Sequence, residues 1–395
     1  MSSILIKNIG KIVSGNYQKP LSDGDSIRVK DGKIEQIGNG LGSEGVDVIV
    51  DAKGLVVTPG LIDSHVHPVL GDFTPRQNTL GYFDACVNGG VTTFISAGEV
   101  HTPGRPRDPV GAKAMAILAH KSFQNLKPGG AKVHAGALML EKGLVEEDFS
   151  ELKKAGVWLV GEIGLGTVQD ADEAALMVKW AHNYGFKCVI HTGGASIAGS
   201  TVIGADFVLK TQPDIVSHIN GGPTAPPFQD IRRIIQESNL TYEIVHCGNG
   251  KAMLEALKIA DQEGKMDKMI IGNDAPSGTG IIPLGILRVV TATSSLGGLS
   301  PANAFALATG NTGRAFGLNI GTIEPGREAD LIVMDAPYGS TAKDALEAVQ
   351  LGDLPGIAAV IIDGELKVQK SRMTPPPGRN IEIRGKTNAP ASSGH

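Results

Sequence analysis

The sequence predicts an α/β protein, a (β/α)8 TIM barrel that carries a small composite β-sandwich formed by both chain ends. Three observations support this prediction. Short apolar segments alternate with helical segments between residues 58 and 317, as in a barrel. Residues 1–57 and 318–380 alternate apolar and polar positions, as strands with one covered face do. Histidines and carboxylates end several central apolar segments, where barrel enzymes carry their catalytic groups.

Composition and charge narrow the classes of function. The chain has 395 residues, of which 41% are hydrophobic, enough for one large core and a smaller one. Its formal net charge of −5 and the lack of a dense Lys/Arg run argue against a nucleic-acid or anionic-membrane partner. The three cysteines are too few for a disulfide framework, and no stretch is long and apolar enough to span a membrane. We therefore expect a cytoplasmic protein with reduced thiols.

Residues 1–57 and 318–380 are expected to join into one discontinuous β-sandwich. Neither end alone offers enough strands for a sheet with a covered face. The expected strands are residues 4–6, 12–13, 26–29, 33–37 and 46–50 at one end, and 329–334, 358–362 and 365–368 at the other. Residues 381–395, beyond a proline-rich stretch, are expected to form a mobile tail.

Residues 58–317 are expected to form the barrel. Its expected strands are residues 61–67, 91–97, 132–138, 157–163, 186–191, 215–219, 242–246 and 269–274. Segments with apolar residues at helical spacing separate them, most clearly at 110–126, 146–154, 171–184, 230–237, 251–263 and 301–316. A doubly wound open sheet is the alternative, but it often begins with a glycine-rich phosphate loop, and the sequence contains no convincing one.

Polar residues gather where the expected barrel strands end. His65 and His67 alternate at the end of the first strand, so both imidazoles point to one face and can share a metal ion. Any single polar residue at a strand end has an ordinary explanation, but the whole set on one rim predicts a metal centre. The set continues with Glu162 on the fourth strand, His191 on the fifth, His218 on the sixth and Asp274 on the eighth.

Six nitrogen and oxygen ligands exceed what one open zinc site needs, since such a site uses three protein ligands. They suit two divalent ions about 3.5–4 Å apart with a bridging hydroxide. We expect Glu162 to bridge the ions. The expected ligands are His65, His67 and Asp274 for one ion, and His191 and His218 for the other. Zn²⁺, Fe²⁺, Co²⁺ and Mn²⁺ all accept such ligands, and affinity order alone does not choose among them.

This pattern resembles the amidohydrolase superfamily. The resemblance rests on the His-x-His after the first strand, the carboxylate on the fourth, the histidines on the fifth and sixth, and the aspartate on the eighth. The flanks agree, since residues 57–63 (Val-Thr-Pro-Gly-Leu-Ile-Asp) and 323–333 (Ile-Glu-Pro-Gly-Arg-Glu-Ala-Asp-Leu-Ile-Val) resemble its composite-sandwich signatures. The resemblance spans nearly the whole chain.

Within the superfamily, the sequence looks most like the enamidases. Glu162 stands where many cyclic-amide hydrolases carry a carboxylated lysine, and the loops at 75–77, 104–106, 191–194, 218–223 and 272–280 agree. The resemblance implies ring opening of 6-oxo-1,4,5,6-tetrahydronicotinate to 2-formylglutarate and ammonia, in nicotinate degradation. It also implies a mixed Fe/Zn centre and a homotetramer. His246, on the seventh strand, is an expected departure, because we expect an amide side chain there in the relatives.

A hydrolytic mechanism follows from such a centre. Metal coordination lowers the pKa of water from 15.7 to roughly 7, so a bridging hydroxide would exist at neutral pH. This hydroxide would attack the ring carbonyl. Asp274 would take its proton and deliver one to the departing nitrogen or the enamine carbon. The released enamine would become an imine and hydrolyse to an aldehyde.

The implied substrate is a small cyclic amide with a carboxylate, and a cation should meet that carboxylate. Arg binds carboxylates through a bidentate fork. Arg76 and Arg105, in the loops after the first two strands, are the preferred substrate-binding candidates. His101, in the loop after the second strand, is a third candidate through a hydrogen bond. Glu99, in the same loop, is expected to be a solvated charge.

Two other interpretations stay open. The chain could be another cyclic-amide hydrolase or a deacetylase, such as a dihydroorotase-like enzyme, and a panel of cyclic amides would separate these. It could also be a metal-binding barrel without turnover, which would have missing ligands or a blocked rim.

Overall fold

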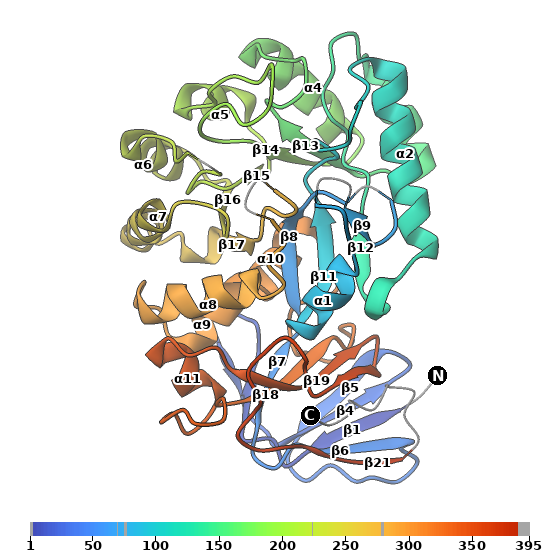
Figure 1. The fold of residues 1–395 in the computed structure, drawn as a ribbon, viewed down its shortest axis with the longest axis vertical. Helices are drawn as coiled ribbons and strands as arrows, with labels where there is room; N and C mark the ends of the chain where they lie inside the picture. Colours follow the sequence, from blue (N-terminus) through green and yellow to red (C-terminus); the bar gives the residue numbers. More distant parts are fainter. Residues whose placement is uncertain (1–2, 69, 75–76, 223, 278–279, 386–395) are drawn as a thin grey trace.

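The computed structural model describes residues 3–68, 70–74, 77–222, 224–277 and 280–385. Figure 1 shows a barrel with helices around its outside and a β-sandwich packed against one end. The barrel strands, all parallel, are β8 (Leu61–Val66), β11 (Val91–Ser96), β12 (Lys132–His134), β13 (Leu159–Ile163), β14 (Lys187–Ile190), β15 (Ile215–Val216), β16 (Thr241–Val245) and β17 (Met269–Gly272). The predicted (β/α)8 barrel is confirmed.

The barrel closes through two short contacts between its ladders. The ladders have the strand orders β12-β11-β8 and β13-β14-β15-β16-β17. Leu138 forms a parallel bridge with Val160, and Val66 forms one with Ala275. β12 and β15 are shorter than predicted, because the chain beyond them keeps only isolated bridges and loop hydrogen bonds.

Apolar side chains fill the barrel below its catalytic rim. One buried cluster joins residues from seven of the eight barrel strand segments, which only the barrel interior can bring together. These are Ile62, Ile95, Ala137, Leu159, Val189, Ile215 and Ile270, with Phe316 and Ile320 packed against them. The barrel interior is therefore a packed core. The polar residues at the C-terminal ends of the strands lie above this core, where they can form a site.

Helices follow the barrel strands in chain order. They are α1 (Tyr82–Asn88), α2 (Pro109–Asn125), α3 (Glu146–Ala155), α4 (Ala171–Asn183), α5 (Ala205–Thr211), α6 (Phe228–Glu237), α7 (Gly250–Gln262), α8 (Gly285–Ser295), α9 (Pro301–Leu307) and α10 (Gly310–Phe316), with short 3-10 turns η1 (Pro128–Gly130) and η2 (Met266–Lys268). The single helix predicted over 301–316 is in fact two, because Thr309 leaves the helical conformation at φ −134°. α1, α5 and α8 lie where helices between barrel strands are expected, but the sequence pattern did not indicate their bounds.

The sandwich combines strands from both chain ends in two sheets, with orders β21-β6-β1-β4-β5 and β20-β19-β18-β7-β2-β3. The strands are β1 (Ile4–Lys7), β2 (Lys11–Val13), β3 (Leu21–Ser22), β4 (Ser26–Lys30), β5 (Lys33–Gly38), β6 (Val48–Asp51), β7 (Val56–Pro59), β18 (Leu331–Asp335), β19 (Gly356–Ile362), β20 (Glu365–Gln369) and β21 (Glu382–Gly385). α11 (Ala345–Leu351) connects β18 to β19, and a small hairpin, β9 (Phe73–Thr74) and β10 (Thr79–Leu80), follows β8.

The C-terminal segment corrects one expectation. Residues 382–385 were placed in a mobile tail, but they form β21, which pairs antiparallel with β6. The alternation Glu-Ile-Arg supplies a strand too short to stand out in the sequence. Residues 386–395, the rest of the expected tail, lie outside the described residues.

The joint between sandwich and barrel lies at Gly60, between β7 and β8. A Cβ on Gly60 would lie 2.2 Å from Thr92 Oγ1, so only glycine permits this close approach. Lys132 of β12 also joins the two parts, since its Nζ lies 2.6 Å from Glu328, 2.8 Å from Asp330 and 2.8 Å from Asp363. No helix among the described residues could cross a membrane.

Candidate metal centre

The structure brings the six predicted rim residues together. His65 lies in β8 and His67 just beyond it, and Glu162 lies in β13. His191 directly follows β14, while His218 and Asp274 each lie two residues beyond β15 and β17. All six are buried, and the most exposed, Asp274, is only 8% exposed. Parallel strands of a closed barrel end at one rim, which is why residues far apart in sequence meet here.

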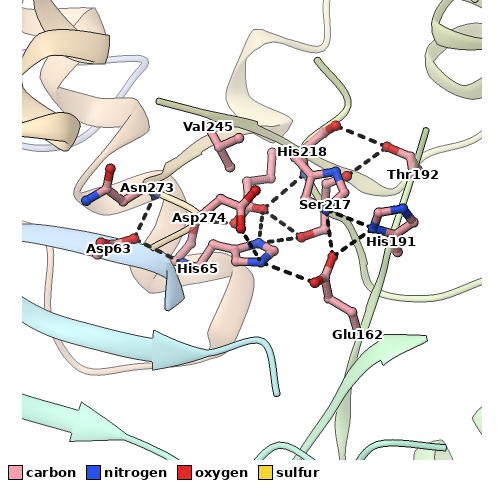
Figure 2. Close-up of polar contacts among 12 residues, drawn as sticks. Asp63, His65, Glu162, His191, Thr192, Ser217, His218, Val245, Asn273 and Asp274 are labelled. Atoms are coloured by element: carbon pink, nitrogen blue, oxygen red, sulfur yellow. Dashed lines mark hydrogen bonds and ion pairs between the residues drawn. The ribbon is translucent and has the colours of Figure 1, made fainter. Parts of the chain in front are cut away.

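Glu162 lies between two sets of histidines. Its Oε1 is 2.6 Å from His218 Nε2 and 3.4 Å from His191 Nδ1. Its Oε2 is 3.5 Å from His65 Nε2 and 3.9 Å from His67 Nε2. Figure 2 shows the carboxylate between His65 on one side and His191 and His218 on the other. This is the arrangement that a carboxylate bridging two cations requires.

Asp274 faces the first histidine pair. Its Oδ1 is 3.3 Å from His67 Nε2 and 3.7 Å from His65 Nε2. Ligand atoms of two overlapping triads, His65–Glu162–His218 and His65–His67–Asp274, lie within 4.8 Å of one another. Asp274 (φ 58°) and His218 (φ 30°) both have left-handed backbones, a strained conformation that is common at functional sites.

The donor set fits divalent cations. His65 Nε2 is buried and has no hydrogen-bond partner among the described residues, although carboxylate oxygens of Glu162 and Asp274 lie beyond hydrogen-bond distance on either side. A cation bound between the two carboxylates would satisfy this nitrogen, so the residues present fit a metal ion. Imidazole and carboxylate together suit Zn²⁺, Fe²⁺, Co²⁺ or Mn²⁺.

Backbone carbonyls orient two of the rings. His67 Nδ1 lies 2.7 Å from the Gly98 carbonyl, and His191 Nε2 lies 2.9 Å from the Gly194 carbonyl. Because a carbonyl only accepts hydrogen bonds, each of these nitrogens carries the proton. The other nitrogen of each ring, which faces Glu162 or Asp274, is thereby left with its lone pair free to bind a metal.

The charges of the centre stabilise one another. Burial alone raises the pKa of Glu162, but the opposing influence of His65 and His218 holds it well below its usual range. Burial alone lowers the pKa of His65, but Glu243 and Glu162 raise it well above 6.5. Burial alone also lowers the pKa of His218, but Glu162 raises it above 6.5. Ionised carboxylates thus attract positive charge here, which protons or metal cations can supply.

The predicted substrate contacts have different environments. The Arg105 side chain is only 5% exposed, with one guanidinium nitrogen 2.5 Å from Glu141 Oε1 and the other 3.2 Å from the Leu165 carbonyl. Its charge is therefore already balanced by a buried carboxylate. The His101 ring packs edge-to-face on His67, with centroids 5.0 Å apart, so His101 lies beside the centre. Arg76 lies outside the described residues.

One of two further rim residues, Glu99, differs from expectation. Glu99 is not a solvated charge: it is 1% exposed, accepts a hydrogen bond from Ser96 Oγ at 3.3 Å, and burial raises its pKa well above the usual value. His246 is half-buried, and burial, with Arg288, lowers its pKa. Its Nδ1 has no hydrogen-bond partner among the described residues.

Sequence reasoning missed Glu243, a fully buried residue of β16 whose Oε2 lies 2.8 Å from His65 Nδ1. The available signal was a single acidic residue inside an otherwise apolar strand, Thr-Tyr-Glu-Ile-Val. Glutamate is seldom fully buried without a partner, so its presence there indicated a buried polar contact. Nothing in the linear pattern identified His65 as that partner.

Comparisons with known proteins agree with this geometry. Residues 56–367 match the Amidohydrolase family. The chain is 53% identical over 385 residues to the enamidase of Eubacterium barkeri, covering 97% of this chain and 100% of that one. It is 28% identical over 280 residues to the allantoinase of Bacillus licheniformis, covering 66% of this chain and 57% of that one.

Solved structures also match this chain. The crystal structure of enamidase matches with a TM-score of 0.95 and 52% identity, over 97% of this chain and 100% of that one. A β-aspartyl dipeptidase from Fervidobacterium islandicum matches with a TM-score of 0.66 and 19% identity, over 94% of this chain and 97% of that one. The second likeness concerns the fold alone.

Proposed function

The chain belongs to the amidohydrolase family and is a hydrolase of C–N bonds, and we propose that it opens the ring of a cyclic amide at a centre of two divalent metal ions. The observation that carries this proposal is the position of Glu162, whose two oxygens lie toward different histidines. A single-metal site needs no such division, whereas a paired site needs a carboxylate between its ions.

In this proposal, Glu162 would be a ligand of both ions. His65, His67 and Asp274 would hold one ion, and His191 and His218 the other, each through the nitrogen or oxygen that faces the cluster. Two bound cations supply a nucleophilic hydroxide at neutral pH and polarise the amide carbonyl. The surrounding burial keeps bulk water away from these charges and so strengthens their effect.

Asp274 is the proposed proton carrier. One oxygen faces the histidines, while Oδ2 lies 3.5 Å from the position that a Gly222 side chain would occupy. The missing side chain leaves room for substrate beside this oxygen. Asp274 would accept the proton of the attacking water and return it to the ring nitrogen as the C–N bond breaks, which is typically worth about 10²–10⁴ in rate.

The proposed substrate is 6-oxo-1,4,5,6-tetrahydronicotinate, by similarity to the enamidase. One water opens the ring amide, and a second hydrolyses the resulting imine, so that 2-formylglutarate and ammonia are released. A native Zn/Fe pair, a homotetramer, a cytoplasmic location and a place in nicotinate degradation are further parts of the proposal and rest on the same resemblance.

Metal analysis and a substrate panel test the proposal. The purified protein should contain two divalent ions per chain and release ammonia from 6-oxo-1,4,5,6-tetrahydronicotinate. Dihydroorotate, hydantoin and the ring lacking the carboxylate should be poor substrates. Preferred cleavage of dihydroorotate or hydantoin would replace the proposed substrate, and protein that binds no divalent ion would overturn the paired centre.

A further inference from the structure

Glu243 contacts both halves of the candidate centre without facing the space between them. Its Oε2 lies 2.8 Å from His65 Nδ1, 2.7 Å from Ser217 Oγ and 3.2 Å from the His218 backbone nitrogen. Its Oε1 accepts a hydrogen bond from Ser64 Oγ. The side chain is fully buried, so these groups are held without competition from bulk water.

The first consequence concerns the His65 ring. A carboxylate only accepts hydrogen bonds, so Nδ1 of His65 must carry the ring proton, which Ser217 Oγ, 2.6 Å away, also contacts. His65 Nε2 then has a free lone pair, directed toward Glu162 Oε2 at 3.5 Å and Asp274 Oδ1 at 3.7 Å. Without this partner, either nitrogen of the ring could hold the proton.

The second consequence concerns the peptide that carries His218. Glu243 accepts the His218 N–H from one side, while Thr192 Oγ1 lies 2.8 Å from the Ser217 carbonyl and 3.1 Å from the His218 carbonyl on the other. His218 has a left-handed backbone at φ 30°, which costs energy and persists only where surrounding contacts fix it. Figure 2 shows the contacts of Thr192 with Ser217 and His218.

We propose that Glu243 is a positioning residue that fixes the tautomer of His65 and the backbone of His218 together, so that one buried carboxylate prepares both halves of the centre for metal binding. This inference rests on the proposed metal-dependent function. It differs from a purely structural role, in which Glu243 would support the barrel but leave metal affinity unchanged.

Glu243→Gln is the sharpest test, because it removes the charge and preserves the shape. A glutamine amide nitrogen can donate to Ser64 Oγ, which would then donate its own proton to the Ile271 carbonyl, 2.9 Å away, in place of Glu243. The amide oxygen can still face His65, but a neutral amide accepts weaker hydrogen bonds than a carboxylate, so it should hold the His65 Nδ1 proton and the His218 N–H less firmly. The full chain should be stripped with a chelator and titrated with Co²⁺, following the visible absorption of the bound ion.

The expected result is a loss of Co²⁺ affinity of about 10–100-fold for the ions at both halves, the usual effect of removing a partner of a metal-binding histidine. The Co²⁺ spectrum should change as well. The matched control is Asp335→Asn in the sandwich, which also neutralises a buried carboxylate, one bonded to Arg379. It should shift the metal-free melting temperature without changing Co²⁺ affinity or spectrum.

Ser217→Ala is the second variant, in case Glu243→Gln does not fold. It removes the hydroxyl next to both His65 Nδ1 and Glu243 Oε2 and should weaken Co²⁺ binding in the same direction. If the unsubstituted chain binds two ions and both variants bind them as tightly, the role of Glu243 is refuted while the proposed function stands. If the unsubstituted chain binds none, both proposals are overturned.

Discussion

Glu162 Oε1 lies 2.6 Å from His218 Nε2, a contact between a strand of the barrel and a loop that begins two strands further along the chain. The short distance directs the second carboxylate oxygen away from His218 and toward His65. The two histidines therefore share a carboxylate without sharing an oxygen. The first prediction tests this division.

Glu162→Gln should reduce the metal content from two ions per chain to one or none, because a neutral amide is a poor bridge between two dications. Activity should fall by more than about 100-fold, beyond the usual effect of residues that only support a ligand. Elemental analysis of dialysed protein, together with ammonia release, measures both. A variant with two ions and near-normal turnover would show that Glu162 does not bridge.

The Asp274→Asn variant should still bind its metal ions but turn over substrate much more slowly. The amide oxygen can still face the cluster, but the side chain can no longer accept a proton, so kcat should fall about 10²–10⁴-fold. Metal content should remain at the level of the unsubstituted chain. Full activity in this variant would rule out the proposed proton transfer.

The stability of metal-free protein should depend on pH in a direction set by the histidines. His65 and His218 have a raised pKa in the folded chain, so their stabilising contribution is complete below the ordinary value of 6.5 and is lost as pH rises through the raised value. Glu162 has a lowered pKa, so its contribution is complete above 4.5 and is lost as pH falls toward its folded value.

The chelated protein should therefore have its highest melting temperature between about pH 4.5 and 6.5 and a lower melting temperature at alkaline pH. The metal-loaded protein should keep its stability at alkaline pH, because bound cations take the place of the protons. Calorimetry of both forms across the pH range measures the difference in melting temperature between the metal-loaded and the metal-free protein. A difference that becomes smaller as pH rises would contradict the assigned charges.

Arg105→Met should destabilise the fold more than it weakens substrate binding. Arg105 is 5% exposed at its side chain and pairs with the fully buried Glu141, which would be left unpaired. Breaking one side of a buried pair typically costs about 3–5 kcal/mol. Chemical denaturation should show this loss, and Arg105→Met combined with Glu141→Gln should recover part of it. A raised KM with unchanged stability would instead identify Arg105 as a substrate contact.

The elements whose bounds the sequence pattern did not indicate are short or have no clear amphipathic period. α1, α5 and β21 are short, and in α5 only Ala205, Val208 and Thr211 are buried, which is too few positions for a clear period. α8 is longer, but its own buried residues lie on several of its faces, so it shows no clear amphipathic pattern. By contrast, Ile231, Ile234 and Ile235 give α6 a single buried stripe, and that helix was predicted.

The sequence by itself determined the barrel, the sandwich strands at both ends and the six polar residues at the strand ends. Strand and helix periods are local, and a parallel barrel sends every strand end to one rim, so these features need no knowledge of distant contacts. Local patterns likewise placed Glu162 on the fourth strand and His218 at the end of the sixth, both at that rim.

Only the tertiary structure decided how those residues meet. It divided the oxygens of Glu162 between two histidine sets, neutralised Arg105 with Glu141, and placed Glu243 against His65 across 178 residues of chain. These outcomes depend on the depth and rotation of each side chain inside a closed barrel. Such quantities arise from packing among distant strands, which a linear pattern of residue types does not record.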